Sequence, residues 1–308
     1  MITTIHFTTC GDIHHDLTNL DKLVTFIKNA KSQGYVDFAA FLGDYATDAT
    51  TINDEQDVKN RFDSLELKYY VAAGNHDVTS LSLAYTNCTD NTPTHTASCI
   101  FNTVFGTFPD QYPPTTNFVR NGITFQILIP GICWNGTTSV FNWKYNFSNS
   151  NISTTNPTLV FNHGSFYCCD GSNPPCSTTV CTCGNWTTYD NVFSNRMLTN
   201  LNNLKVIAAY SGHLHAYSEN RKTSSYVTNG KLFVSHDTIN TVTGTTSSRC
   251  SADATRFIGY TKVTYDSTTG ISTVDYQKMA FRDANGNVLP FIYPFDCPQS
   301  ICNFTITQ

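Results

Sequence analysis

Hydrophobic positions in the first third of the chain follow two different periods. Residues 4–10 and 68–73 are predicted to be strands, and the short apolar run at 38–42 predicts a buried strand. Apolar residues recur at helical spacing in segment 20–31, and a second helix is predicted at 54–65. Repeated strand–helix–strand units of this kind predict a parallel sheet with helices packed outside it.

The rest of the chain has a looser pattern. Residues 79–156 are rich in Thr, Asn and Pro, and we expect long loops there around two strands, near 117–121 and 123–129. The further elements predicted are strands at 158–162 and 205–210, a helix at 189–204, and short strands at 225–228, 231–236, 257–265 and 271–279. Without an internal repeat or a low-complexity linker, the pattern predicts one domain, residues 1–308, with a loop-rich insertion at about 79–156.

The composition excludes several classes of protein. The 308 residues are 40% hydrophobic and only 13% charged, whereas disordered chains combine low hydrophobicity with high charge. A run of 18 apolar residues is absent, so no transmembrane segment is predicted. With 18 basic and 23 acidic residues, the chain lacks the basic surface that binds nucleic acid. A soluble globular protein remains, and the pattern gives no indication of its oligomeric state.

Five of the 12 cysteines lie in one turn-rich loop, residues 168–183. A zinc ribbon needs paired Cys-x2-Cys knuckles, which the adjacent and one-residue spacings in this loop do not provide. Disulfides suit these spacings better and imply an oxidising compartment. Two further pairs that could close short loops are Cys88 with Cys99 and Cys297 with Cys302.

Cysteine usage therefore predicts a secreted or extracellular protein, or a lysosomal or vacuolar one. The chain starts in a strand-like run without an apolar leader, so we expect that a signal segment has been removed. Glycosylation would follow from secretion, but the number of acceptor triplets is what chance gives in a chain this rich in Asn, Ser and Thr. The triplets begin at Asn87, Asn135, Asn146, Asn151, Asn185 and Asn303.

Residue types that bind metals follow five of the predicted strands. They occur as Asp12-Ile13-His14, Gly43-Asp44, Gly74-Asn75-His76-Asp77, His163, and Gly212-His213-Leu214-His215. Each cluster alone is commonplace, but ligands in open α/β sheets bind outside the carboxyl ends of the strands. The five clusters are therefore predicted to converge on one rim.

These residue types suit two neighbouring metal ions. Imidazole and carboxylate groups bind zinc, manganese and iron alike, and none of the five clusters contains a cysteine. Two metals about 3.5–4 Å apart need a shared ligand, which a carboxylate provides with its two oxygens. Such a pair clamps a phosphoryl oxygen and generates hydroxide from water near neutral pH. We therefore expect two divalent or trivalent ions (Zn, Mn or Fe) and phosphoryl chemistry.

In order and type, the five clusters resemble the pattern of the calcineurin-like metallophosphoesterase superfamily. That pattern is Asp-x-His, Gly-Asp, Gly-Asn-His-Asp/Glu, His, and Gly-His-x-His, and here it spans residues 12–215. The resemblance implies an α/β fold, a four-layer α/β/β/α sandwich of two mixed β-sheets flanked by helices. It also implies a two-metal site at the rim formed by the carboxyl ends of the strands.

The resemblance implies seven metal ligands and a general acid. The first metal would be held by Asp12, His14 and His215, the second by Asn75, His163 and His213, and Asp44 would bridge the two. His76 would not bind metal but would contact the phosphate and protonate the leaving oxygen. A nearby carboxylate would orient His76, and the candidates are Asp77 and Asp48.

The subfamily stays open because the chain departs from each pattern. Purple acid phosphatases have a Tyr three residues after the bridging Asp, where this chain has Thr47, although residues 212–217 are similar to their Gly-His-x-His-Ala-Tyr run. The Asp-Arg-Gly of protein Ser/Thr phosphatases is missing after Asp44, and Gly164 stands where many phosphodiesterases have Pro.

Three residues near the motifs have competing interpretations. His15 either lines the substrate pocket or lies on the surface, and the surface is favoured. His236, at the end of a predicted strand, is expected to be structural. Cys10 is expected to be a buried thiol or a disulfide partner rather than a ligand.

The function expected is hydrolysis of phosphate esters by metal-bound hydroxide at a binuclear centre. The substrate would be a small-molecule, lipid or nucleotide phosphate ester, and the scarcity of arginine slightly favours diesters over monoesters. The alternative is a catalytically silent binding or scaffold protein on the same fold. Family members of that kind tend to lose ligands, and none of the seven is missing here.

Overall fold

A computed structural model describes most of the chain. The described residues are 1–47, 52–78, 96–106, 115–134, 143–146, 152–164, 205–213, 218–222, 231–236, 239 and 256–295. Several predictions fall outside them: Asp48, His215, the Cys-rich loop 168–183, the helix at 189–204 and the strand at 225–228. The side chain of Asn75, the cysteine pairs and the glycosylation triplets are also outside what the structure describes, and all of these stay predictions.

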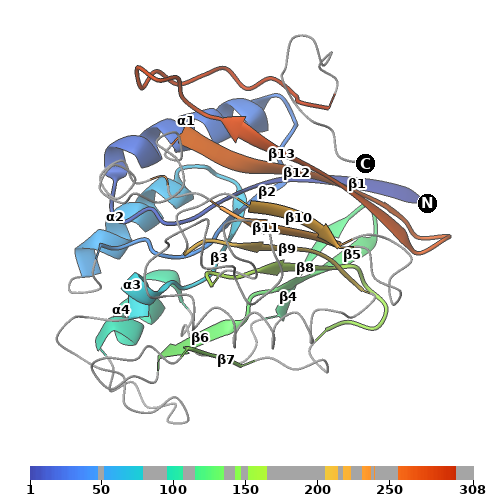
Figure 1. Ribbon diagram of the computed structural model, residues 1–308, viewed down its shortest axis with the longest axis horizontal. Helices are drawn as coiled ribbons and strands as arrows, with labels where there is room; N and C mark the ends of the chain where they lie inside the picture. Colours follow the sequence, from blue (N-terminus) through green and yellow to red (C-terminus); the bar gives the residue numbers. More distant parts are fainter. Residues whose placement is uncertain are drawn as a thin grey trace, which may run out of the picture.

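Sheet 1 has five strands in the order β13-β12-β1-β2-β3. Its members are β1 (Ile2–Cys10), β2 (Phe38–Phe41), β3 (Lys68–Val71), β12 (Phe257–Asp266) and β13 (Ile271–Ala280). The first three strands run parallel, whereas β12 and β13 are antiparallel to their neighbours. The N-terminal strand is therefore the centre of the sheet, flanked on one side by strands from near the C-terminus (Figure 1).

Sheet 2 has six strands in the order β10-β11-β9-β8-β5-β4. They are β4 (Thr115–Arg120), β5 (Ile123–Leu128), β8 (Thr158–Phe161), β9 (Val206–Ser211), β10 (Ser218–Lys222) and β11 (Lys231–Ser235). The four central strands are parallel and the two edge strands are antiparallel. A separate hairpin pairs β6 (Gly131–Trp134) with β7 (Trp143–Asn146). Both main sheets are thus mixed, as the resemblance implied.

The described helices lie beside sheet 1 and at the end of the sandwich. They are α1 (Leu17–Ser32), α2 (Ile52–Asp63), α3 (Asn75–Val78) and α4 (Thr96–Phe105). The side chain of Asp16 caps α1 by accepting a hydrogen bond from the Asn19 N–H. This helix buries Leu20, Leu23 and Ile27 because their spacing places them on one face.

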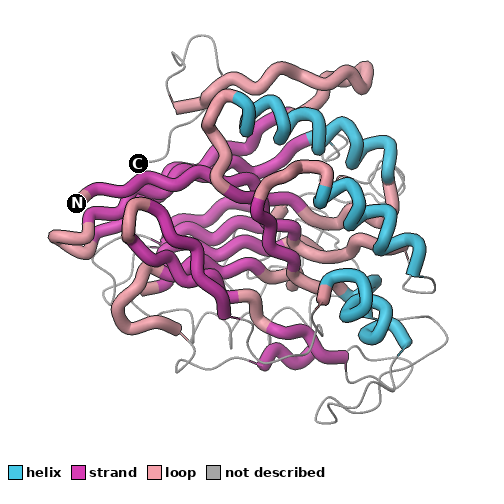
Figure 2. The backbone as a smooth tube through the Cα atoms, turned by 180° about the vertical axis from the view of Figure 1, so that it is seen from behind, coloured by secondary structure: helices cyan, strands magenta, loops and turns pink. Residues whose placement is uncertain are grey.

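Two apolar cores divide the described residues into three layers. One lies between the sheets, where Phe7 stacks on Phe38 with ring centroids 4.7 Å apart. The other lies between sheet 1 and the helices, and it includes Phe41, Phe62 and Tyr260 (Figures 1 and 2). The resemblance implied four layers, and the predicted helix at 189–204 is outside the described residues.

Most predicted strands and both N-terminal helices are confirmed, with ends shifted by a few residues. The segment 79–156 differs from the prediction, because α4 and the β6–β7 hairpin lie within it besides the two expected strands. Phe101 and Phe105 of α4 pack against the ring of Tyr45, so tertiary contact stabilises a helix that Thr-rich composition concealed. In the part of the chain that the structure describes, no helix is both long and apolar enough to cross a bilayer.

Candidate metal centre

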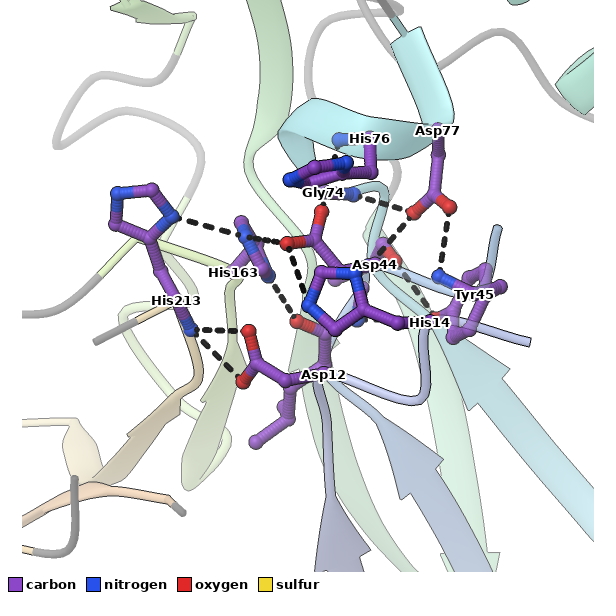
Figure 3. Close-up of polar contacts among 12 residues, drawn as sticks. Asp12, His14, Asp44, Tyr45, Gly74, His76, Asp77, His163 and His213 are labelled. Carbon is purple, nitrogen blue, oxygen red and sulfur yellow. Dashed lines mark hydrogen bonds and ion pairs between the residues drawn. The ribbon is translucent and has the colours of Figure 1, made fainter. Parts of the chain in front are cut away.

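The segments that follow β1, β2, β3, β8 and β9 meet at one rim of the sandwich (Figure 3). Asp44 lies in the middle of this group and is almost completely buried. Its Oδ2 is 3.2 Å from Nε2 of His163 and 3.6 Å from Nε2 of His14. Its Oδ1 accepts the backbone N–H of His76 at 2.9 Å. Side chains from both sheets therefore converge on a single carboxylate.

Charge at the rim favours an ionised Asp44. Burial alone would raise the pKa of this carboxyl, but the imidazoles of His163, His76 and His14 outweigh burial and hold the pKa well below its usual range. For His163, burial lowers the pKa, and the charge of Asp44 more than offsets it, so the pKa rises to about 9. Asp44 and His163 therefore stabilise each other's charged forms.

Two groups of side chains could each hold a metal ion. One consists of His14, Asp44 and His76, and the other of Asp44, His163 and His213. Within each group the donor atoms lie within 4.8 Å of one another. Asp44 belongs to both groups, which is the position expected of a bridging ligand. The donor set of buried carboxylate and imidazole thus fits two ions that share Asp44.

Backbone contacts orient the two histidines of sheet 2. Nδ1 of His163 donates to the carbonyl of Leu42 at 2.6 Å, which leaves Nε2 facing Asp44 and Nδ1 of His213 at 3.2 Å. This is the arrangement in which a histidine ligand is fixed by a hydrogen bond from its other nitrogen. His213 in turn donates its backbone N–H to both carboxylate oxygens of Asp12, at 2.9 and 3.0 Å.

Asp12 is completely buried beside the two groups but belongs to neither of them. Its carboxylate faces the backbone of His213 (Figure 3). Asn75 begins α3 next to Asp44, while its side chain and all of His215 lie outside the described residues. The structure therefore brings His14, Asp44, His163 and His213 together and places Asp12 alongside.

Backbone conformation sets the site apart from the rest of the molecule. Seven described non-glycine residues have positive φ, and five of them are at this rim. These five are Asp12 (55°), His14 (46°), His15 (57°), Asp44 (56°) and His213 (72°). Because the left-handed region is unfavourable for side chains with a Cβ, such clustering is characteristic of functional sites.

The loops that carry the ligands are bonded to one another. Backbone N–H groups of Asp12 and His14 donate to the carbonyls of Gly43 and Asp44 at 2.9 and 2.8 Å. A Cβ on Gly74 would overlap Oδ1 of Asp44. A glycine is therefore required before Asn75 so that the third loop can approach the second. The glycine in each motif was visible in the sequence, but its contact was not.

Thr47 is a site residue that sequence reasoning missed as a participant. Its hydroxyl donates to the carbonyl of His14 at 2.9 Å, and its own carbonyl accepts from Nδ1 of His76. The rings of His76 and His14 meet edge-on with centroids 4.7 Å apart. A backbone carbonyl leaves no signal in the sequence, so only the departure from the purple acid phosphatase Tyr pointed to this position.

The carboxylate of Asp77 is turned toward backbone amides rather than toward the ring of His76. Four N–H groups donate to its two oxygens (Figure 3). Tyr45 is buried, with its hydroxyl 2.8 and 2.7 Å from the carbonyls of Phe41 and Ala72, which directs it away from the metal groups.

The structure also describes the surroundings of the three residues with competing interpretations, Cys10, His15 and His236. Cys10 is a buried free thiol, as one of its two interpretations held. Nε2 of the partly exposed His15 is 3.5 Å from a carboxylate oxygen of Asp57 in α2. His236 is buried between the sheets and shares a hydrogen bond of 2.8 Å with the Thr9 hydroxyl, in keeping with a structural role.

The chain was compared with protein-family models, with curated protein sequences and with solved structures. A family model described as calcineurin-like phosphoesterase matches residues 5–217, which is more than half of the chain. No sequence among the curated proteins matches the chain.

Three solved structures are similar to the chain at low identity. The 5′-nucleotidase precursor from Thermus thermophilus is 10% identical, with a TM-score of 0.49 over 90% of this chain and 55% of that one. Purple acid phosphatase PPD1 from yellow lupin (Lupinus luteus) seeds is 13% identical, with a TM-score of 0.49 over 94% and 53%. GAP50, the anchor in the inner membrane complex of Plasmodium, is 13% identical, with a TM-score of 0.40 over 91% and 90%. The chain spans about half the length of the first two. Since every TM-score is below 0.5, the evidence of kinship is the family model.

Proposed function

The chain belongs to the calcineurin-like phosphoesterase family, and we propose on this basis that it hydrolyses phosphate esters with two bound metal ions. The observation that carries the proposal is the position of Asp44, which belongs to both groups of candidate ligands. A shared carboxylate is what a two-metal site needs to hold its ions close together.

The residues present fit such a pair of ions. His14 and Asp44 would hold the first, with Asp12 and His215 as further candidates, and Asp44, His163 and His213 would hold the second together with Asn75. When bound, the ions would polarise the phosphoryl oxygens and lower the pKa of water at the site. Zn, Mn and Fe all suit imidazole and carboxylate donors.

His76 is proposed as the general acid that protonates the leaving oxygen. Its Nδ1 bonds to the carbonyl of Thr47, so the proton available for transfer is on Nε2. The ring is less buried than Asp44 and contacts the ring of His14. Since His14, Asp44 and His76 also form one candidate metal group, metal content must be measured together with activity.

The substrate proposed is a small-molecule, lipid or nucleotide phosphate ester. We would compare p-nitrophenyl phosphate with bis-p-nitrophenyl phosphate at pH 5 and pH 7.5, with Zn²⁺ or Mn²⁺ added. Faster cleavage of the monoester at pH 5 identifies an acid phosphatase, and faster cleavage of the diester identifies a phosphodiesterase. No cleavage of either ester by the metal-loaded protein contradicts the proposal and supports a scaffold.

Two variants assign the activity to the site. Asp44→Asn removes the shared charge and should lose both metals and nearly all turnover, whereas His76→Ala should keep both metals and lose about 10²–10⁴-fold in turnover. Metal content measured by mass spectrometry separates the two effects. An Asp44→Asn protein with full activity rules out this centre, and a His76→Ala protein that loses a metal makes His76 a ligand.

We also propose that the protein works in an oxidising compartment, outside the cell or in a lysosome or vacuole. The 12 cysteines support this, as does the crowding of five of them in residues 168–183. Mass spectrometry of the unreduced protein purified from its source would detect the paired cysteines. A complete set of free thiols would contradict the proposal.

A further inference from the structure

Asp77 is a buried carboxylate with an unusual set of partners. Its Oδ2 accepts the N–H groups of Gly74 at 2.7 Å and Asp44 at 2.8 Å. Its Oδ1 accepts those of Tyr45 at 2.7 Å and Ala46 at 3.2 Å. All four donors are backbone amides, and the side chain is fully buried. The carboxylate therefore replaces the secondary-structure bonds that these four amides lack.

The four amides belong to two different loops. Three of them follow β2 and include Asp44 itself, and the fourth precedes α3 after β3. A return contact runs the other way, because the N–H of His76 donates to Oδ1 of Asp44 at 2.9 Å. Asp44 is thus held at its backbone by Asp77 and at its side chain by the residue before Asp77.

Only an ionised carboxyl matches this arrangement well. It offers two oxygens that accept and no hydrogen that donates, so four N–H groups can share it, whereas an amide would direct its own N–H₂ at two of them. The cost is the burial of a second negative group near Asp44. Burial and the charge of Asp44 raise the pKa of Asp77 to about 6, against the hydrogen bonds, which lower it.

The glycine between the loops shows how little freedom Asp44 has. A Cβ on Gly74 would overlap both Oδ1 and the backbone N of Asp44. The left-handed backbone of Asp44 (φ 56°) is held in the space that this glycine leaves open. Because this conformation is unfavourable for a residue with a Cβ, it needs contacts from its surroundings, and the hydrogen bond from the Asp44 N–H to Asp77 is one of them.

We propose that Asp77 is a positioning residue that sets the direction of the Asp44 carboxylate through the backbone, and so controls the affinity of both metal positions. This inference rests on the proposed two-metal function but assigns Asp77 to Asp44 rather than to the imidazole of His76. It predicts that loss of Asp77 weakens metal binding by both groups although Asp77 touches no metal.

The test measures metal affinity and turnover separately in Asp77→Asn. We would titrate the metal-free protein with Co²⁺ by calorimetry and record its visible absorption, which reports the coordination geometry. The affinity should fall about 10–100-fold with an altered spectrum, as for other residues that orient metal ligands. Unchanged affinity for two Co²⁺ ions and an unchanged spectrum would overturn the inference, even if turnover had fallen.

A matched control is Glu55→Gln. Glu55 is also a fully buried carboxyl, in α2, and its oxygens make no hydrogen bond with any residue that the structure describes. Burial and the charge of Asp77 raise the pKa of Glu55 to about 10, so its carboxyl is neutral in the folded protein. Replacing it with a neutral amide should therefore leave Co²⁺ affinity within about twofold of the wild type. Should it lose as much affinity as Asp77→Asn, the effect is a general response to a buried polar change and the inference fails.

A second variant covers the case in which Asp77→Asn does not fold, as judged by circular dichroism. In Gly74→Ala the added Cβ would overlap the backbone N and Oδ1 of Asp44, which are the atoms that bond to Asp77 and to His76. This variant should lower Co²⁺ affinity while leaving Asp77 intact. Wild-type affinity in Gly74→Ala overturns the inference. The proposed function fails separately from this inference. A wild-type protein that binds two Co²⁺ ions without cleaving any ester refutes hydrolysis, but not the positioning of Asp44 by Asp77.

Discussion

The two sheets contribute to the candidate centre in different ways. On the side of sheet 1, the loops after β1, β2 and β3 are bonded to one another through backbone amides, the glycines and Asp77. On the side of sheet 2, His163 and His213 reach across the rim. Nδ1 of His163 bonds to Leu42, and the N–H of His213 bonds to Asp12, so both contacts end on sheet 1.

The difference teaches how the geometry of the site is determined. Sheet 1 has its own scaffold, in which each loop fixes the next, whereas the histidines of sheet 2 take their orientation from sheet 1. A change in the loops of sheet 1 should therefore reach both candidate metal positions, since Asp44 is common to them. A change at a histidine of sheet 2 should affect one position.

The largest expected effect comes from variants that remove one candidate metal position and leave the other intact. His163→Ala removes a ligand from the second group only, so one metal should remain while turnover falls at least about 100-fold. Asp44→Asn, in contrast, should lose both metals. Metal content of the two purified variants, measured in parallel, checks the comparison, and equal loss of metal from both would contradict it.

An intermediate effect concerns the contact between the loops of sheet 1. Gly43 has φ +90°, and a Cβ there would lie 2.6 Å from the N of Gly74 and 2.7 Å from Nδ1 of His163. Gly43→Ala should lower the free energy of unfolding by about 3 kcal/mol, from backbone strain plus overlap. Urea denaturation of the metal-free protein measures this.

Gly270→Ala is the matched control for that experiment. Gly270 has a similar left-handed conformation (φ +72°), but nothing lies within 4 Å of an added Cβ. This variant should cost only about 1 kcal/mol, because the backbone strain is the same and the overlap is absent. If the two variants cost the same, the loops of sheet 1 are not packed as tightly as the structure indicates.

The smallest effect concerns a link between the sheets below the site. His236 follows β11 of sheet 2 and bonds to Thr9 of sheet 1. Burial, with a smaller contribution from the charge of Lys278, lowers the pKa of His236 to about 3, while Asp12 acts in the opposite direction. The neutral imidazole therefore stabilises the folded state above pH 6.5, and this contribution is lost progressively as the pH falls toward 3.

His236→Gln should remove that dependence on pH. Between pH 7 and pH 5, His236 should account for about 2 kcal/mol of lost unfolding free energy in the wild type, and the variant should lack this loss. Urea denaturation at the two pH values measures the difference. Parallel curves for the two proteins would show that His236 takes up no extra proton on unfolding.

The sequence predicted the elements whose signal is local. Apolar runs such as 38–42 identify buried strands because burial on both faces requires a continuous hydrophobic segment. The metal-ligand types after those strands were equally visible, and four of the seven proposed ligands are now in two groups around Asp44. Their convergence follows from strand direction alone.

Features that depend on contacts between distant loops were not predictable. The carbonyls of Leu42 and Thr47 act through the backbone, which carries no residue-specific signal. Asp77 has the same motif position whether its carboxylate faces His76 or four amides, and only the folded geometry decides between these. Helix α4 was missed because its burial against Tyr45 depends on a partner 56 to 60 residues away in the chain.

The strand order of sheet 1 has a consequence for the protein while it is being synthesised. The central strand β1 precedes all the other described strands in the chain, yet its partner on one side is β12, where Gly259 pairs with Thr9. About 250 residues separate the two, which at roughly 5–20 residues per second means a delay of roughly 12–50 s. Throughout that interval the emerging chain carries β1 with one edge unpaired. A nascent chain of this protein therefore exposes the open edge of β1 until β12 has been translated.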